Sequence, residues 1–400
     1  MHNPDLTINS ASMEKKNLTI IYLTTLMAVL GVASLAPAFP AISEHFNISI
    51  TTVTLLITIF TLPGIFLAPV IGIIADHVGR KPILIASLVI FGISGLACFF
   101  VKTWEFILVL RFLQGIGAAS LGSLNVTLIG DLFSGKRRGE IMGYNASVLS
   151  IGTAAYPAIG GGLALSGWHF PFLLPGLALP IALLAVFWLK NPEPDKQVSI
   201  KKYLSNTWKN INKKTVWGIF LVNVLLFVLL YGAFLSYFPP LLKERLQAST
   251  FHIGLLMSAF SVVTALTASQ KKRIDNRLPV KHQLLLGITF YIATMLILSF
   301  ANNWWHLVFP LLLFGMGHGM LVPGIQTLLV GFAPLAERAG FMSINSMVLR
   351  IGQTTGPLFI GLFYTAGGVT SAFIGGALVA VIMFVLTISM VKANQPNNLS

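Results

Sequence analysis

Three side chains that can carry charge interrupt long apolar stretches of the sequence, namely Arg111, His318 and Arg350. An unpaired cation in a hydrocarbon layer costs at least about 2.5–3.5 kcal/mol, so an apolar span does not retain one without a use or a partner. Arginine binds anions through several N–H donors, and histidine exchanges protons near neutral pH. These residues therefore predict a polar cavity within a membrane, with a hydrogen-bonded packing role as the alternative for His318.

Uncharged residues that could contact a ligand accompany these charges. Asn125 follows Arg111 on one face of a helical span, and Gln353 follows Arg350 by three positions. Aromatic rings at spacings of three could stack on a flat lipophilic ligand, with core packing as the alternative, and a first-span hydroxyl would face them. The predicted contacts from this set are Tyr231, Phe234, Tyr237 and Ser34.

The acidic residues set the predicted charge of the ligand. All 12 Asp and Glu residues lie outside the apolar spans or at their ends. A cavity with two arginines and no carboxylate should repel organic cations and favour neutral or anionic amphipathic molecules. If transport is proton-linked, we expect Asp131 or His318 to carry the proton.

A second group of charges occupies a short break between two apolar spans, from Gly72 to Leu84. A carboxylate and two cations within six positions can attract one another at the membrane edge. Asp131, at the end of a later span, could complete a charge triad. We interpret the group as a latch between conformations, with a solvated, positively charged turn as the alternative. Its residues are Gly72, Asp76, Gly79, Arg80, Lys81 and Asp131.

The elements that position these residues are membrane helices. The chain has 400 residues, of which 10% are charged, and a mean hydropathy of +0.83. Such a composition cannot cover a water-facing surface. About 20 apolar residues span a bilayer, and this length predicts twelve spans with both termini on one side. Their approximate limits are 18–40, 53–74, 82–101, 106–129, 141–164, 170–189, 216–238, 253–269, 283–301, 305–329, 341–363 and 368–391.

The distribution of basic residues predicts the orientation. Most of the 26 Lys and Arg residues lie on the side of the termini and of the long polar linker, which assigns that side to the cytoplasm. This bias also accounts for the net charge of +14 without a nucleic acid partner. The predicted organisation is a tail at 1–17, a six-helix bundle at 18–189, a cytoplasmic linker at 190–214, a second bundle at 215–391 and a tail at 392–400.

The two halves of the chain are copies related by an offset of 200 residues. The match is strongest in the fifth and eleventh spans, where small residues and prolines permit close crossings and bends. Six spans repeated in one orientation imply a pseudo-twofold axis along the membrane normal, with the ligand site between the halves. The repeated packing residues are Gly152, Pro157 and Gly161 in the first copy, and Gly352, Gly356, Pro357 and Gly361 in the second.

Several motifs resemble those of the major facilitator superfamily over essentially the whole chain. The turn Gly72-x-x-Ala75-Asp76-x-x-Gly79-Arg80-Lys81 resembles the signature between its second and third helices. The runs RFLQGIGAA (111–119), LGVASLAPAFP (30–40) and GTAAYPAIGG (152–161) are similar to motifs of its twelve-helix drug/proton antiporters. One departure is Tyr156, which stands where a glycine usually precedes the proline. The resemblance implies a latch at Asp76, Arg80 and Asp131 that locks the outward-facing state.

The predicted protein is therefore an all-α membrane protein with two pseudosymmetric six-helix halves in a cell membrane. The resemblance implies a monomeric secondary transporter that exports small amphipathic compounds by alternating access and proton antiport. An exporter or importer of an anionic metabolite or lipid, without proton coupling, is the second hypothesis. The sequence has no H-E-x-x-H motif and no phosphate-binding G-x-x-x-x-G-K-[ST] loop, which argues against an intramembrane enzyme and a primary pump. With Cys98 as its one cysteine, no metal or cofactor is expected.

Overall fold

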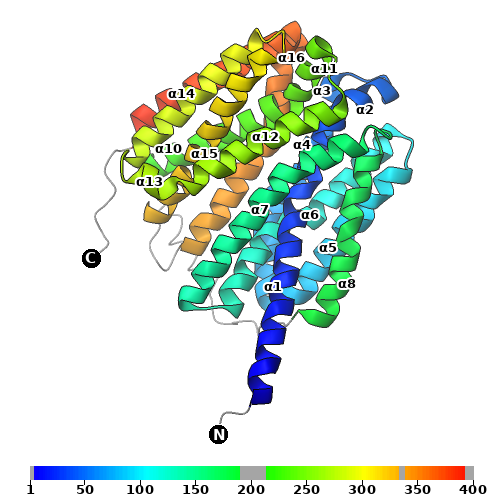
Figure 1. Cartoon of the computed structure of the whole chain (residues 1–400), viewed down its shortest axis with the longest axis vertical. Coiled ribbons are helices and arrows are strands. Elements are labelled where there is room, and N and C mark those ends of the chain that lie inside the picture. Colours follow the sequence, from blue (N-terminus) through cyan, green and yellow to red (C-terminus); the bar gives the residue numbers. More distant parts are fainter. Residues whose placement is uncertain (1–3, 190–212, 333–337, 392–400) are drawn as a thin grey trace.

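The computed structural model describes residues 4–189, 213–332 and 338–391, and the regular structure of these residues is entirely helical (Figure 1). Residues 190–212 of the predicted linker at 190–214 lie outside the described residues. So do residues 1–3 of the first predicted tail and the whole second predicted tail at 392–400. The helices divide into a first half and a second half that lie side by side (Figure 1).

The helices of the first half follow the predicted spans, with short irregular pieces near one end. Proline at the first turn opens two of these pieces, where its missing N–H is tolerated. The elements are α1 (Pro4–Ala33), η1 (Ala36–Ala38), α2 (Phe39–Phe46), α3 (Ile50–Val53), α4 (Leu55–Val78), α5 (Arg80–Phe100), α6 (Trp104–Leu132), α7 (Gly135–Leu163), η2 (Phe170–Leu177) and α8 (Ala178–Trp188).

The second half repeats this order and adds one wide segment. The segment η3 is a π-helix that precedes Pro239 and Pro240, which lack the N–H groups needed to continue a regular ladder. The elements are α10 (Lys214–Val228), η3 (Leu229–Tyr237), α11 (Phe238–Leu246), α12 (Thr250–Ser269), α13 (Lys271–Asp275), α14 (Val280–Ser299), α15 (Trp305–Phe332) and α16 (Arg338–Met390).

Ten helices among the described residues are long and apolar enough to cross a membrane by length and composition. The difference from twelve predicted spans has two causes. The predicted fifth span is α7, a 29-residue helix whose sequence is rich in Gly, Ser and Thr. The predicted eleventh and twelfth spans form the single element α16, which bends at Gly367 and Gly368. Gly368 has a φ of +66°, a conformation that favours glycine.

Each half has its own apolar core. Leu56, Phe91 and Leu121 lie in the first core, whereas Leu229 and Phe314 lie in the second. Side-chain packing of this kind stabilises helix bundles in a membrane, where lipid tails are as apolar as leucine. The two cores agree with two six-helix units.

Local details repeat at the 200-residue offset. Asn47 and Gln247 both end a helix in the left-handed conformation, with φ of 51° and 50°. The side chains of Ser49 and Ser249 then cap the next helix by accepting a hydrogen bond from its third residue. The two copies therefore build the same connection between their first and second membrane helices.

The helices have a basic end, where Arg80, Lys136 and Lys271 lie, and an opposite end, where Asn47 and Gln247 lie. Hydrogen bonds join the halves from mid-helix toward the opposite end. The Thr250 hydroxyl donates to Gly161 O at 2.8 Å, and the Thr58 hydroxyl donates to Thr354 O at 3.1 Å. The described halves are therefore held together at the opposite end.

Candidate functional site

A cavity of about 400 Å³ lies between the two halves. Helices α1, α4 and α7 line it from the first half, and η3, α12, α15 and α16 line it from the second. Most of the lining is aliphatic or aromatic, as in typical sites for small organic ligands. Its aromatic residues are Phe60, Tyr231, Phe234 and Phe260, and its polar residues are Thr61, Ser150, Thr153, Ser261, Thr264, His318, Arg350 and Gln353.

Arg350 is the cation of this lining, and α16 directs it toward the first half. Its Nη2 donates to Ala118 O over a long distance of 3.4 Å, which leaves most of its N–H groups for other acceptors. Gly64 on α4 makes room for it, because a Cβ at that position would lie 3.0 Å from Arg350 Nε. The guanidinium therefore reaches across the interface between the halves.

His318 also lines the cavity, from α15. Its Nδ1 lies 2.6 Å from the Tyr291 hydroxyl, and Phe260 packs beside the ring. The bonded nitrogen is the one turned toward α14, so the geometry holds the imidazole in one orientation. The predicted intramembrane histidine therefore faces both a cavity and a hydrogen-bond partner.

The prediction that Arg111 lines the cavity is wrong. Arg111 is 1% exposed and lies inside the first bundle. Its guanidinium donates to Leu56 O, Gly31 O and Gln114 Oε1, and it lies 4.2 Å from the centre of the Phe60 ring. These contacts join three helices, so Arg111 is a packing residue with neutral acceptors as partners.

Three further predicted ligand contacts also lie off the cavity lining. Ser34 donates to Leu30 O in its own helix, and its backbone packs against Gly160. Asn125 is buried and donates to Ile21 O and Thr25. Tyr237 is buried against Tyr364, and its hydroxyl donates to Pro357 O at 3.3 Å. Of the aromatic trio, Tyr231 and Phe234 line the cavity and Tyr237 does not.

The predicted latch is partly described. Arg80 and Asp131 form an ion pair across the basic end of the first half. Gly79 has a φ of +101°, which explains a glycine at this turn. Lys81 donates to Val186 O at 2.7 Å, at the end of α8. A Cβ at Gly72 would meet no atom of the described residues within 4 Å. The side chain of Asp76 lies outside the described residues.

The predicted helix-packing residues lie at close crossings. A Cβ at Gly161 would lie 2.3 Å from Thr250 O in the other half, and one at Gly352 would lie 2.4 Å from Val224 O. A Cβ at Gly356 would lie 2.9 Å from Val228 O, whereas Gly152 and Gly361 lie against side chains, those of Leu26 and Tyr237. Pro157 and Pro357 lie inside α7 and α16. These positions allow the backbones to touch.

Comparisons with known proteins agree with this architecture. The family model described as Major Facilitator Superfamily matches residues 21–249 and 224–399. The chain belongs to the Major Facilitator Superfamily. The two matches, one for each half, reflect the internal repeat. Among solved structures with this fold, the nucleoside transporter NupG has a TM-score of 0.79 at 15% identity, covering 94% of this chain and 100% of that one.

Curated members of the superfamily resemble the whole chain in sequence. "Multidrug resistance protein 1" of Bacillus subtilis (strain 168) is 25% identical over 357 residues, which cover 88% of this chain and 91% of the relative. "Bacillibactin exporter" of the same organism is 27% identical over 410 residues, covering 96% of this chain and 99% of the relative. The superfamily and the apolar helices identify a multi-pass membrane transport protein of the drug-antiporter-like branch.

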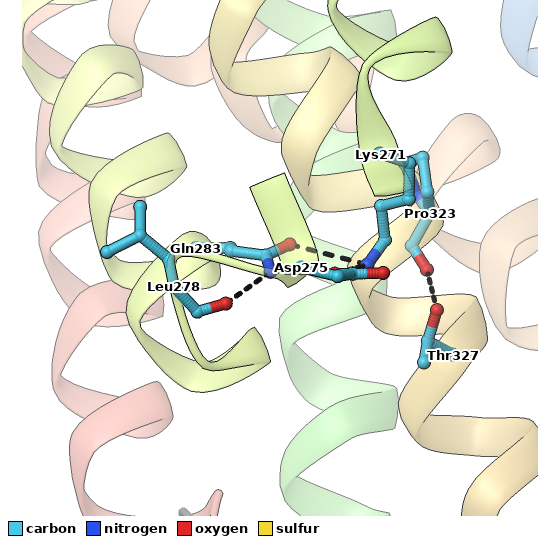
Figure 2. A network of polar contacts seen from close by, with 6 residues as sticks. All are labelled: Lys271, Asp275, Leu278, Gln283, Pro323 and Thr327. Carbon is cyan, nitrogen blue, oxygen red and sulfur yellow. Dashed lines mark hydrogen bonds and ion pairs between the residues drawn. The ribbon is translucent and has the colours of Figure 1, made fainter. Parts of the chain in front are cut away.

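The second half of this superfamily member also contains a polar cluster that the sequence did not predict. Asp275 pairs with Lys271 and accepts a hydrogen bond from Gln283 Nε2 at 2.8 Å (Figure 2). Gln283 is fully buried and also donates to Leu278 O at 2.7 Å. We call Lys271, Asp275 and Gln283 the second-half clasp. A Lys-x-x-x-Asp spacing beside a Gln at the start of a span was the available signal.

Proposed function

We propose that this chain exports small amphipathic compounds by alternating access of its two halves to a shared cavity. The observation that carries the proposal is the apolar cavity of about 400 Å³, lined by both halves beside Arg350. Contacts between the halves at the opposite end, such as Thr58 with Thr354, fit a state that is closed on that side. The names of the relatives, a multidrug resistance protein and an exporter, support outward transport.

Several further features belong to the same proposal. The chain lies in a cell membrane with its basic end and both termini on the cytoplasmic side, as the distribution of Lys and Arg favours. The chain works as a monomer with bundles at 18–189 and 215–391, joined by a cytoplasmic linker, and has no nucleic acid partner. The first-half latch of Asp76, Arg80 and Asp131 stabilises the outward-facing state.

The electrostatics of the cavity support a neutral or anionic substrate. Arg350 is the charged residue among the described lining, where Tyr231 and His318 are the other titratable groups. A cation placed beside Arg350 would be repelled in a medium of low dielectric constant. Resistance profiles of an efflux-deficient host that expresses the chain test this point, with cationic, neutral and anionic compounds compared. We expect protection against neutral and anionic compounds, and protection confined to cations would contradict the proposal.

Proton antiport would use His318 or Asp131. His318 lies in the cavity, so a proton on its ring and a substrate nearby would influence each other. Asp131 pairs with Arg80 of the same half at the basic end, where a proton on its carboxylate would break the pair. His318→Gln and Asp131→Asn should be compared in vesicles for substrate-driven proton flux. We expect one variant to lose the flux, and unchanged flux in both would leave uncoupled transport of an anionic metabolite or lipid as the function.

A further inference from the structure

The cavity contains polar groups that the protein itself does not satisfy. Gln353 is 7% exposed and lines the cavity, yet its buried Oε1 has no hydrogen-bond partner among the described residues. A buried amide without partners is costly, and native structures rarely contain one without a reason. Gln353 therefore indicates a missing ligand group.

The hydroxyls of the lining do not share this property. Thr153 donates to Ser150 O, Ser261 to Met257 O, and Thr264 to Phe260 O, each within its own helix. Their protons are already used, so these residues contribute shape more than recognition. Among the described lining residues, the buried side-chain oxygen without a partner is therefore Gln353 Oε1, on α16.

Arg350 lies one helical turn before Gln353 on the same face of α16. Residues three apart on a helix lie about 5–6 Å apart between their Cβ atoms. The Arg350 guanidinium offers donors, and the Gln353 carbonyl needs one. The phenol of Tyr231 lies near enough to Arg350 for an electrostatic interaction and adds an aromatic wall.

We infer that the cavity selects aromatic organic anions that carry a hydroxyl donor on the same ring system as the anionic group. The anionic group binds Arg350, the hydroxyl donates to Gln353 after its amide turns about the last side-chain bond, and the ring lies among the aromatic residues. This inference rests on the proposed function and narrows its substrate class. It also assigns Gln353 the discrimination between hydroxylated and plain anions, with Arg350 binding both.

Two probes test the inference on the intact chain in lipid nanodiscs. In 4-hydroxy-2-naphthoate the hydroxyl is meta to the carboxylate, so it does not bond internally, whereas 2-naphthoate lacks the hydroxyl. Dissociation constants come from equilibrium dialysis. We expect the hydroxylated probe to bind about tenfold more tightly, as one satisfied buried polar group implies.

The variants assign this preference to residues. Gln353→Met keeps the length of the side chain, and we expect it to weaken only the hydroxylated probe, so that the ratio of dissociation constants falls to about one. Arg350→Met should weaken both probes by about tenfold or more. The matched control is Thr355→Val on the exposed side of the same helix, whose hydroxyl is already bonded within α16, and it should keep the wild-type ratio.

Any of these results would overturn the inference: equal affinities in the wild type, an unchanged ratio in Gln353→Met, or a ratio lost in Thr355→Val. Failure of both anions to bind, in a chain that still protects a host against neutral compounds, also overturns it and leaves the proposed function intact. If the chain binds the probes as expected but does not export compounds, the proposed function is contradicted and the inference about binding is not. Thermal unfolding of every variant confirms that the compared proteins are folded.

Discussion

At the residue scale, the two intramembrane arginines of this chain have different roles. Arg111 is surrounded by carbonyl acceptors of its own bundle, whereas Arg350 makes one long hydrogen bond and borders a cavity. Both interrupt apolar stretches of the sequence, so their sequence contexts look alike. The difference lies in whether the protein satisfies the guanidinium or leaves it to a ligand.

This difference predicts opposite effects on stability. Arg111→Met removes the donor from three buried acceptors, and at about 1–3 kcal/mol for each unsatisfied group it should lower the free energy of unfolding by at least about 3 kcal/mol. Arg350→Met is the matched control, and we expect it to change the free energy by less than about 1 kcal/mol. Thermal unfolding in detergent, followed by intrinsic fluorescence, measures both. Similar losses in the two variants would contradict the distinction.

The same residues show how far the candidate site could be predicted from the sequence. Helical periodicity predicted that four residues face a ligand, and the structure places them in the cavity lining: Arg350, Gln353, Tyr231 and Phe234. Periodicity does not say which neighbour a face contacts, because tilt and rotation depend on packing with other helices. Arg111 was therefore assigned to the cavity although its face contacts the core of its own bundle.

At the element scale, apolar length predicted the helices well because a bilayer fixes the length of a span. The helix α7 was predicted from the same apolar length, although its sequence is too polar to be among the ten helices that qualify by length and composition. The π-helix η3 was not predicted, since it depends on how a proline pair and the neighbouring helices share backbone hydrogen bonds. The second-half clasp was not predicted either, because it depends on how α13, with Lys271 and Asp275, packs against the start of α14, with Gln283.

The two helices that contain a proline repeat, α7 with Pro157 and α16 with Pro357, each form a hydrogen bond with a hydroxyl of the opposite half. The Ala158 N–H, next to Pro157, donates to Ser258 Oγ at 3.0 Å, and Thr58, which is 200 positions before Ser258, donates to Thr354 O near Pro357. A proline removes one N–H donor from the helix that contains it, and each hydroxyl bonds a backbone group within three residues of such a proline. One such hydrogen bond therefore lies between α7 and α12, and the other lies between α4 and α16.

Loss of these hydroxyls should favour opening at the opposite end. At about 0.5–1.5 kcal/mol per bond, Ser258→Ala or Thr58→Val should each raise the open population about two- to twelvefold. The readout is alkylation of Ser261→Cys in a Cys98→Ala background by a membrane-impermeant reagent added at that end. Thr355→Val, whose hydroxyl bonds within its own helix, should have no effect. Equal rates in all variants would refute the role of the hydroxyls.

The second-half clasp should stabilise the basic end in a pH-dependent manner. Burial opposes ionisation of Asp275, but hydrogen bonds from Lys271 and Gln283 outweigh it and hold the pKa of the carboxyl below its usual value. A depressed pKa stabilises the folded state above the ordinary value of about 3.9 and loses that contribution as the pH falls through the folded pKa. The contribution should therefore be constant from about pH 5 upward.

Gln283→Leu tests the clasp. It removes two hydrogen bonds from a buried amide, and we expect the free energy of unfolding to fall by about 1–2 kcal/mol at pH 7. The gap in unfolding temperature between wild type and variant should shrink below about pH 4. Thr289→Val, on the exposed side of the same helix, is the control. A gap that widens as the pH falls would contradict the sign of the pKa shift.

At the scale of the whole molecule, one ion pair connects the halves at the rim of the opposite end. Lys243 Nζ of α11 lies 3.3 Å from Glu44 Oε1 of α2, and both side chains are exposed. An exposed pair contributes at most about 1 kcal/mol and is screened by salt. It can therefore adjust the balance between closed and open states but cannot determine it.

Reversal of this pair should shift the whole transporter. Lys243→Glu places two carboxylates at the rim, and we expect faster alkylation of Ser261→Cys from the opposite end, by less than about tenfold at low ionic strength. Glu44→Lys combined with Lys243→Glu should restore the wild-type rate, and about 1 M salt should remove most of the difference. Glu105→Lys changes a charge at the same end on the exposed first turn of α6, away from the interface, and should leave the rate unchanged. A double variant as fast as Lys243→Glu would show that the pair does not act between the halves, and closure at that end would then depend on the glycine crossings and the paired hydroxyls alone.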